Sequence, residues 1–304
     1  MKETEETKRQ EWLEKRRKGI GGSDVAPIMG LSTWSTAYDV WKEKIGLKQA
    51  EGRDTRQQAY GKLMEGTLRD WYTEETGRKV VVPDMIVSPE HPFMLANLDG
   101  ITGDQRIVEI KTARSGKDWD LDTVTIPVYY ATQVQHYMIV TGFHVADVVV
   151  SIAGSMPEIY EIPEDIDMQR VIVDAEREFW QMVQENRAPE PVTFEDALAR
   201  FGGSAQTGVV LATTEAIEAH RWIKDMKSVI EELSSQMEKK KAIIMNLLAD
   251  EGDTLTDSMG VTLVTWKLAK GRKAFDTDRF REEHPDLYDQ YVSQRPGSRR
   301  FLPK

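Results

Sequence analysis

The chain has no cysteine among its 304 residues and only five histidines. Without thiols it forms no disulfide, thiolate zinc site or iron–sulfur cluster, and the absence fits a reducing compartment. No apolar run approaches the roughly 18 residues that predict a membrane span. The charged stretch from Met1 to Lys18 also lacks the apolar centre of a signal peptide. We therefore expect a cytoplasmic protein with no membrane partner.

The composition is that of a globular protein, with 40% hydrophobic and 30% charged residues, and the length allows one or two domains. A net charge of −11 argues against a nucleic-acid partner. The charges are segregated, however. Residues 8–18 hold six Lys or Arg against two Glu, and residues 261–304 hold ten against six acidic residues, whereas residues 155–200 hold twelve acidic residues against four Arg. A local basic groove for DNA therefore remains compatible with the overall charge.

A candidate site centres on Asp99 and on the run Glu109, Ile110 and Lys111. The apolar stretch 93–98, the turn residues 100–104 and the alternating stretch 106–112 predict a β-hairpin. Side chains two apart on a strand share a face, so Glu109 and Lys111 are predicted to point the same way as Ile107, with Asp99 close to them. This pattern places two carboxylates and an ammonium on one face of a sheet.

Two carboxylates and the backbone carbonyl of Ile110 are hard oxygen ligands suited to Mg²⁺ or Mn²⁺. A lysine beside a metal-bound water can orient that water, whose pKa the metal lowers. The pattern therefore indicates attack on a phosphodiester, with Asp99, Glu109 and Ile110 binding metal and Lys111 positioning the nucleophile. The alternative is a solvated strand that carries a Glu–Lys pair.

Three other stretches supply candidate site residues. Arg16 and Ser23 flank a glycine-rich approach to a short helix that Ser23 is expected to cap, where a phosphate can bind, although an ordinary capped turn has the same pattern. Glu65 lies at the edge of the apolar stripe of a helix over 54–76, one turn after Gly61, and pairs equally well with Arg69.

A helix over 128–140, opened by Pro127, aligns Tyr130, Gln133 and Tyr137 on one side. A glutamine on an aromatic face needs a hydrogen-bond partner there, either at the site or in the backbone. Further helices are predicted over 3–18, 36–45 and 165–186, with strands over 80–87, 147–153 and 159–162. This element order predicts an α/β fold with a central mixed sheet flanked by helices.

The last third is predicted to be a separate extension. Residues 201–204 read as a linker that divides the chain into domains 1–200 and 201–304. Residues 214–250 carry apolar side chains at 3–4 spacing, which predicts a long helix with a coiled-coil-like seam interrupted at Lys240. We expect that seam to pack within its own domain. A hairpin over 254–268 and a basic tail with aromatic neighbours follow, and their role is open among DNA contact, oligomerisation and partner docking.

Five motifs together resemble the YqaJ-type viral recombinase family, which includes lambda exonuclease within the PD-(D/E)XK nucleases. The resemblance covers about residues 10–190. In chain order the motifs are R-x(6)-S at Arg16 and Ser23, Y-G-K-x(2)-E at 60–65, L-D-G at 98–100, E-I-K at 109–111 and Q-V-Q-x-Y at 133–137.

This resemblance implies a PD-(D/E)XK nuclease core and a Mg²⁺-dependent (or Mn²⁺-dependent) 5′→3′ exonuclease that acts on double-stranded DNA ends and feeds a single-strand annealing protein. Asp99, Glu109 and the Ile110 carbonyl then bind metal, Lys111 positions the water, Glu65 completes the metal environment and Gln133 supports the site. Arg16 and Ser23 receive the 5′-phosphate. The candidates for a further DNA contact are Arg114, Lys117 and Tyr130.

The family's ring-shaped trimers suggest a homo-oligomer, and its viral members suggest a phage or prophage origin in a bacterial cytosol. Two alternatives stay open. One is an endonuclease or repair nuclease that uses the same metal chemistry on internal or structured sites. The other is a DNA-end binding module without activity.

Overall fold

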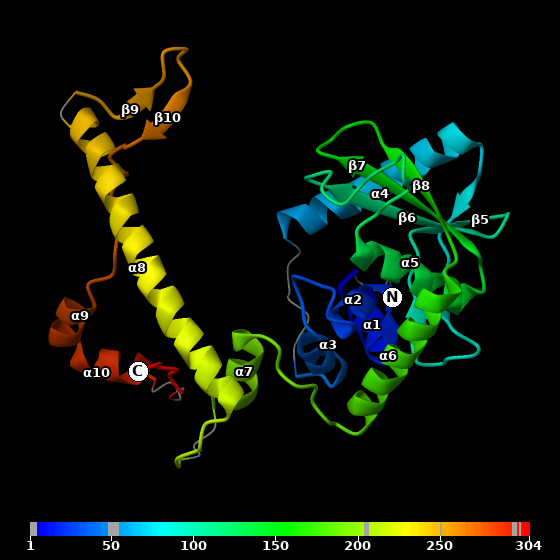
Figure 1. Ribbon diagram of the computed structural model, residues 1–304, viewed down its shortest axis with the longest axis horizontal. Helices are drawn as coiled ribbons and strands as arrows, with labels where there is room; N and C mark the ends of the chain where they lie inside the picture. Colours follow the sequence, from blue (N-terminus) through cyan, green and yellow to red (C-terminus); the bar gives the residue numbers. More distant parts are fainter. Residues whose placement is uncertain (1–4, 48–54, 204–206, 250, 294–296, 298) are drawn as a thin grey trace. The chain divides into compact units, whose positions relative to one another are not determined.

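The computed structural model describes residues 5–47, 55–203, 207–249, 251–293, 297 and 299–304 (Figure 1). Its contacts divide the chain into an N-terminal unit, Met1–Arg200, and a C-terminal unit, Phe201–Lys304, each considered by itself below. The N-terminal unit is a mixed α/β structure built on a five-stranded sheet, and it contains every site residue predicted above.

The central sheet has the strand order β2-β5-β6-β7-β8. Strands β6 and β7 run parallel, and the other neighbours are antiparallel. The parallel pair needs a crossover, which helix α5 (Val128–Thr141) provides. The bounds are β2 Val80–Val81, β5 Gly100–Thr102, β6 Arg106–Ala113, β7 Val145–Ile152 and β8 Glu158–Pro163.

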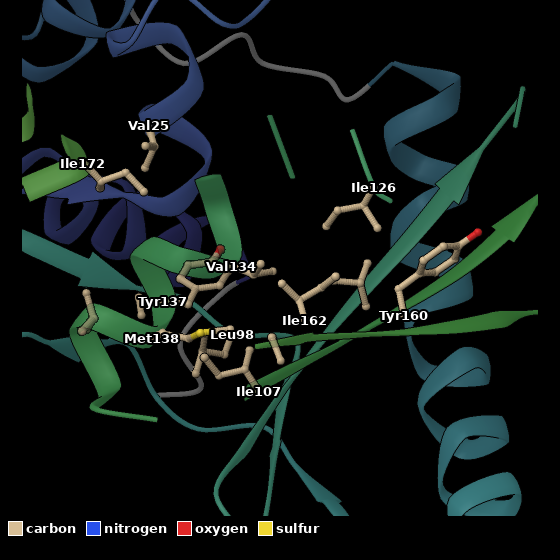
Figure 2. Close-up of a cluster of buried hydrophobic side chains, with 14 of the residues drawn as sticks. Val25, Leu98, Ile107, Ile126, Val134, Tyr137, Met138, Tyr160, Ile162 and Ile172 are labelled. Carbon is tan, nitrogen blue, oxygen red and sulfur yellow. The ribbon is translucent and has the colours of Figure 1, made fainter. Parts of the chain in front are cut away.

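Both faces of this sheet are buried, which explains the apolar runs of β6 and β7. One core lies between the sheet and α5, where Met138 sits beside Leu98 and Ile107 (Figure 2). The other core lies under helix α4 (Arg56–Thr76), where Leu68 and Tyr72 pack against the opposite face of β6. The strand that carries Glu109 and Lys111 is therefore fixed from both sides.

The hairpin prediction is half correct. Strand β6 does form a hairpin, but its partner is β5, and the stretch 93–98 contributes β4 (Met94–Ala96) to a second sheet. There β4 pairs in parallel with β1 (Ile20–Gly21) and antiparallel with β3 (Ile86–Val87). Gly100 belongs to strand β5 rather than to the turn, and a glycine is needed there because a Cβ would lie 2.2 Å from Val80 Cγ1. Ile107 shares the α5-facing side of β6 with Glu109 and Lys111, as predicted, and it is fully buried there.

The helices begin and end close to the predicted residues. Thr55 caps α4, and Gly77 ends it in the left-handed conformation that glycine favours. The remaining helices of this unit are α1 Glu5–Arg17, α2 Gly22–Ile28, α3 Ala37–Lys44, α6 Ile166–Gln184 and α7 Phe194–Phe201. The prediction that Ser23 caps α2 is wrong, because the N-cap is Gly21 and Ser23 lies inside the first turn.

In the C-terminal unit, α8 (Thr214–Leu248) is one continuous helix through Lys240. It is followed by the hairpin of β9 (Thr254–Thr256) and β10 (Thr262–Thr265), then by α9 (Thr277–Glu283) and α10 (Pro285–Tyr291). Ile230, Leu233 and Met237 of the apolar seam are each more than half exposed. Within the described ranges, no helix is both long and apolar enough to cross a bilayer.

Candidate active site

One cavity of about 240 Å³ is lined by most of the candidate site residues predicted from the sequence. Strand β6, helices α2, α4 and α5, the end of α1 and the segment around β4 all contribute to its wall. The lining residues are Trp12, Arg16, Gly21, Gly22, Ser23, Glu65, Met85, Leu95, Asn97, Asp99, Glu109, Ile110, Lys111, Gln133 and Tyr137. Five motifs that are far apart in the sequence therefore meet at one place.

Asp99 stands immediately before β5 and turns its carboxylate toward β6. Its Oδ2 accepts a hydrogen bond of 2.8 Å from the backbone N–H of Ile110. Burial raises the pKa of Asp99 above its usual range, although Lys111 and the Ile110 N–H oppose that rise. The hydrogen bond fixes the aspartate beside the Glu109–Ile110–Lys111 run, as the sequence pattern predicts.

Glu109 is the most deeply buried charged side chain that lines the cavity, with only 2% of it exposed. Its Oε1 accepts hydrogen bonds from Lys111 Nζ at 2.5 Å and from Gln133 Nε2 at 2.8 Å. Its Oε2 is buried and has no hydrogen-bond partner among the described residues. Burial, with the nearby charge of Asp99, raises the pKa of Glu109 to about 7.

Lys111 is held by three neighbours. Besides Glu109, its Nζ donates to Gln133 Oε1 at 3.2 Å and lies 4.6 Å from the centre of the Tyr130 ring. Burial opposes the charged form, but Glu109 and Asp99 outweigh it and raise the pKa of Lys111. The ammonium therefore stays charged, and its position over Tyr130 adds a cation–π contact.

Gln133 links the other polar side chains of the site by hydrogen bonds, which explains why a glutamine stands on the aromatic side of α5. Its amide nitrogen donates to Glu109 and to Tyr137 Oη, the latter at 3.0 Å, and its carbonyl oxygen accepts from Lys111. Each polar atom of the amide is used, so Gln133 fixes the acid and the base of the site relative to each other.

Glu65 completes the set from α4. It is half-buried, and burial together with the charge of Asp99 raises its pKa. Gly61, one turn earlier, lies against β6, where a Cβ would be 3.6 Å from Thr112 Oγ1. Glu65, Asp99 and Glu109 therefore form one group of mutually repelling carboxylates around Lys111.

The donor set fits a hard divalent cation. Three carboxylates and the Ile110 backbone line the cavity, and the unpartnered Oε2 of Glu109 is an available acceptor. Among the described residues, no three side chains drawn from His, Cys, Asp and Glu lie close enough together to form a preassembled metal site. Carboxylate and carbonyl oxygens are nevertheless the ligands that Mg²⁺ and Mn²⁺ prefer.

Arg16 and Ser23 meet at the other side of the cavity. Arg16 Nη2 donates to Ser23 Oγ at 3.0 Å and to Asp24 Oδ1 at 2.8 Å, and Nε donates to Glu43 at 3.2 Å. The glycines serve packing as well as turning, since a Cβ on Gly22 would lie 2.5 Å from Tyr137 Cε1. The backbone N–H of Gly21 is already bound to Asp24 Oδ2 at 2.9 Å.

Asp24 and Lys44 were not predicted as part of this region. Lys44 Nζ lies 2.7 Å from Asp24 Oδ2, and both side chains are buried. Burial alone raises the pKa of Asp24, but Lys44 and Arg16 outweigh it and lower the pKa to about 2. The pair is 20 residues apart in the sequence, and nothing in the sequence indicates that the two side chains meet.

The remaining candidates lie elsewhere. Arg114 and Lys117 are exposed and do not line the cavity. The ring of Tyr130 packs against the ammonium of Lys111. Trp12, Asn97 and Tyr137 line the cavity without having been named as site residues. Tyr137 was detectable from its position one turn after Gln133, and Trp12 from its position one turn before Arg16.

The sequence matches the model of the YqaJ-like viral recombinase domain over residues 11–144. That span includes every residue that lines the cavity, from Trp12 to Tyr137. The YqaJ protein of Bacillus subtilis (strain 168), described as uncharacterized, is 31% identical over 310 residues, which cover 97% of this chain and 94% of that protein.

Two solved structures share the fold. They are crystal structures of the alkaline exonuclease LHK-Exo from Laribacter hongkongensis and of LHK-Exo in complex with dAMP. Each covers 59% of this chain and 94% of its own, at 21% identity, with TM-scores of 0.50 and 0.51. The mixed sheet with its flanking helices is thus the nuclease fold expected from the motifs. With a relative that matches over nearly its whole length, the chain belongs to the YqaJ-like viral recombinase family.

Proposed function

We propose that this protein is a metal-dependent deoxyribonuclease that degrades double-stranded DNA from its ends in the 5′→3′ direction. The observation that carries the proposal is Glu109 Oε2, a buried carboxylate oxygen without a hydrogen-bond partner in a cavity shared with Asp99 and Lys111. An ordered water or an ion can complete such a carboxylate, and here Asp99 and Glu65 line the same cavity and add oxygen ligands that suit a cation. The family and the exonuclease fold point to the same class of reaction.

Asp99, Glu109, the Ile110 carbonyl and Glu65 are the groups that would hold Mg²⁺ or Mn²⁺. When bound, the ion supplies a nucleophilic water at neutral pH and neutralises charge on the attacked phosphate. Burial raises the pKa values of Asp99 and Glu109, and for Glu109 the charge of Asp99 adds to the rise. A bound cation would favour the ionised carboxylates and lower both pKa values.

Lys111 acts as the positioned cation of the site. Its ammonium is fixed by Glu109, Gln133 and Tyr130, so it can hydrogen-bond the attacking water or a phosphate oxygen with little reorganisation. Gln133 holds both partners of that pair, and Tyr137 in turn holds Gln133. The network excludes bulk water, because Glu109 and Gln133 are both buried.

The exonuclease neighbours and the pairing of Arg16 with Ser23 in the cavity favour an exonuclease over an endonuclease. Arg16 and Ser23 lie in the same cavity, and we propose that they receive the terminal 5′-phosphate.

The wider biological role follows from the family. A recombinase-type exonuclease leaves 3′ single strands, so we propose a single-strand annealing protein as partner, a homo-oligomer as the working form and a phage or prophage origin. Arg114, Lys117 and Tyr130 remain proposed DNA contacts outside the cavity or on its edge.

One experiment tests the reaction and its direction. Linear duplex with 5′-phosphate ends, the same duplex with 5′-hydroxyl ends and a covalently closed circle are incubated with Mg²⁺ or with chelator. We expect degradation of the phosphorylated duplex in Mg²⁺ alone, slower loss of the hydroxyl duplex and an intact circle. Nicking of the circle would favour the endonuclease, binding of ends without product would favour the inactive module, and equal rates on both ends would remove the phosphate role of Arg16 and Ser23.

A further inference from the structure

A row of aromatic rings leads from Lys111 to the protein surface. Lys111 Nζ lies 4.6 Å from the Tyr130 ring centre, Tyr130 lies 4.5 Å from Tyr129, and Tyr129 lies 4.9 Å from Trp34 at an interplanar angle of 88°. Tyr129 and Tyr130 are half-buried on α5. Trp34, which lies between α2 and α3, ends the row and is 72% exposed.

Trp34 is held in place despite its exposure. Its backbone N–H and that of Ser35 both donate to Ser32 Oγ, at 3.2 and 3.3 Å. One edge or face of the indole is set against Tyr129, so most of the ring presents to solvent in one orientation. A fixed aromatic surface that faces water gains little for the fold, but it is the feature on which a nucleic-acid base stacks.

We propose that Trp34 is a stacking platform for an unpaired base of the DNA strand that enters the cavity. This inference rests on the proposed function, because it needs DNA at Lys111. The three ring contacts place the indole within about four base steps of Lys111, at about 3.4 Å per step. Stacking is tolerant of base identity, as a nuclease that degrades any sequence requires. The base would be separated from its complement and kept from re-pairing while the terminal phosphodiester lies against Glu109 and Lys111.

The test uses binding in a background that does not cut. In Lys111→Ala, duplexes carry 2-aminopurine at one of the first four nucleotides from the 5′ end, and quenching of its fluorescence reports stacking. We expect quenching at one position, loss of that quenching when Trp34→Ala is added, and retention of most of it with Trp34→Phe. Trp222→Ala is the matched control, since Trp222 is 64% exposed in the C-terminal unit. Quenching that persists in Trp34→Ala, or is lost equally in Trp222→Ala, would overturn the platform.

Kinetics separate this proposal from the nuclease itself. With Lys111 intact, Trp34→Ala should raise KM for duplex about tenfold and change kcat by less than about twofold. An abasic nucleotide at the quenched position should raise the wild-type KM similarly and add little to Trp34→Ala, because both remove the same contact. If the wild type degrades no DNA, the proposed function fails. If it degrades DNA and these KM values do not change, only the stacking platform fails.

Discussion

Two clusters of buried charge, one around Asp24 and one around Glu109, each include a residue that lines the cavity, and they are balanced differently. Around Asp24, two acids face two bases, because Lys44 and Arg16 both reach its carboxylate and Glu43 reaches Arg16. Around Glu109, the acids Asp99 and Glu65 raise its pKa and the base Lys111 opposes them, while Arg69 offsets only Asp99 and Glu65. The first cluster lowers the pKa of Asp24 to about 2 and the second raises the pKa of Glu109 to about 7.

This contrast separates structure from chemistry. A buried carboxylate with a full set of partners resembles other ion pairs that hold elements together, here α1, α2 and α3. A buried carboxylate with a missing partner costs stability and persists where the missing charge arrives with a ligand. The balance of charge, rather than burial alone, therefore favours the Glu109 cluster as the proposed cation site.

The largest effect on activity should come from removing Lys111, the base that pairs with Glu109. Lys111→Ala is expected to lower the rate of DNA cleavage by about 10²–10⁴-fold, since it removes the group that orients the water or the phosphate. Binding of DNA ends should change by only a few-fold, because Arg16 and Ser23 are untouched. Single-turnover cleavage and equilibrium binding measure the two. Lys79→Ala is the control, since Lys79 is exposed and does not line the cavity. Unchanged turnover in Lys111→Ala would exclude the assigned role.

The next effect tests the balanced cluster. Asp24→Ala leaves the ammonium of Lys44 buried without its partner, so the free energy of unfolding should fall by about 3–5 kcal/mol. Urea denaturation measures it. Glu43→Gln removes a partner whose side chain is 30% exposed, and that change should cost less than about 1 kcal/mol. If the two variants lose similar stability, the Asp24–Lys44 pair does not have the structural weight assigned to it.

Much of the fold was predictable because helices are governed by local signals. The helix over 54–76 was predicted within two residues of α4, since Thr55 and Gly77 are strong local signals for its two ends. Strand partners depend on distant contacts. The assignment of 93–98 to the hairpin failed because β4 pairs with β1 and β3, and no local pattern reports those pairings.

The site residues also divide into those that local sequence patterns predict and those that depend on distant contacts. Asp99, Glu109 and Lys111 lie within 13 consecutive residues, and the spacing alone predicts that they meet. Gln133 needed the face pattern of α5 to be noticed. Lys44 has neither a motif nor a nearby partner in the sequence, and only the packing of α3 against α2 brings it to Asp24. Ser23 was correctly grouped with Arg16, which it contacts, but its predicted role as a helix cap was wrong.

The smallest effect is the pH dependence of stability that comes from Glu109. Its pKa is raised by folding, whereas the pKa of Asp24 is lowered. The pKa of Glu109 is about 7 in the folded protein and about 4.3 when unfolded. The folded state therefore holds a proton that the unfolded chain releases, and this stabilisation is complete below the unfolded pKa and is lost as pH rises through 7. Without divalent ions, the wild type should lose on the order of 3 kcal/mol between pH 4 and pH 8 from this group alone.

Glu109→Gln mimics the protonated carboxyl at every pH, so in chelator it should match the wild type near pH 4 and exceed it at pH 8. Urea denaturation at both pH values measures the difference, with Glu178→Gln, an exposed carboxylate on α6, as the control. Mg²⁺ at pH 8 should then stabilise the wild type and not Glu109→Gln, because only the ionised carboxylate attracts the cation. A variant that is less stable than the wild type at pH 8 in chelator would mean that Lys111 already balances Glu109. In that case the cluster would be a structural ion pair like that of Asp24, and the argument for a cation at this cavity would lose its main support.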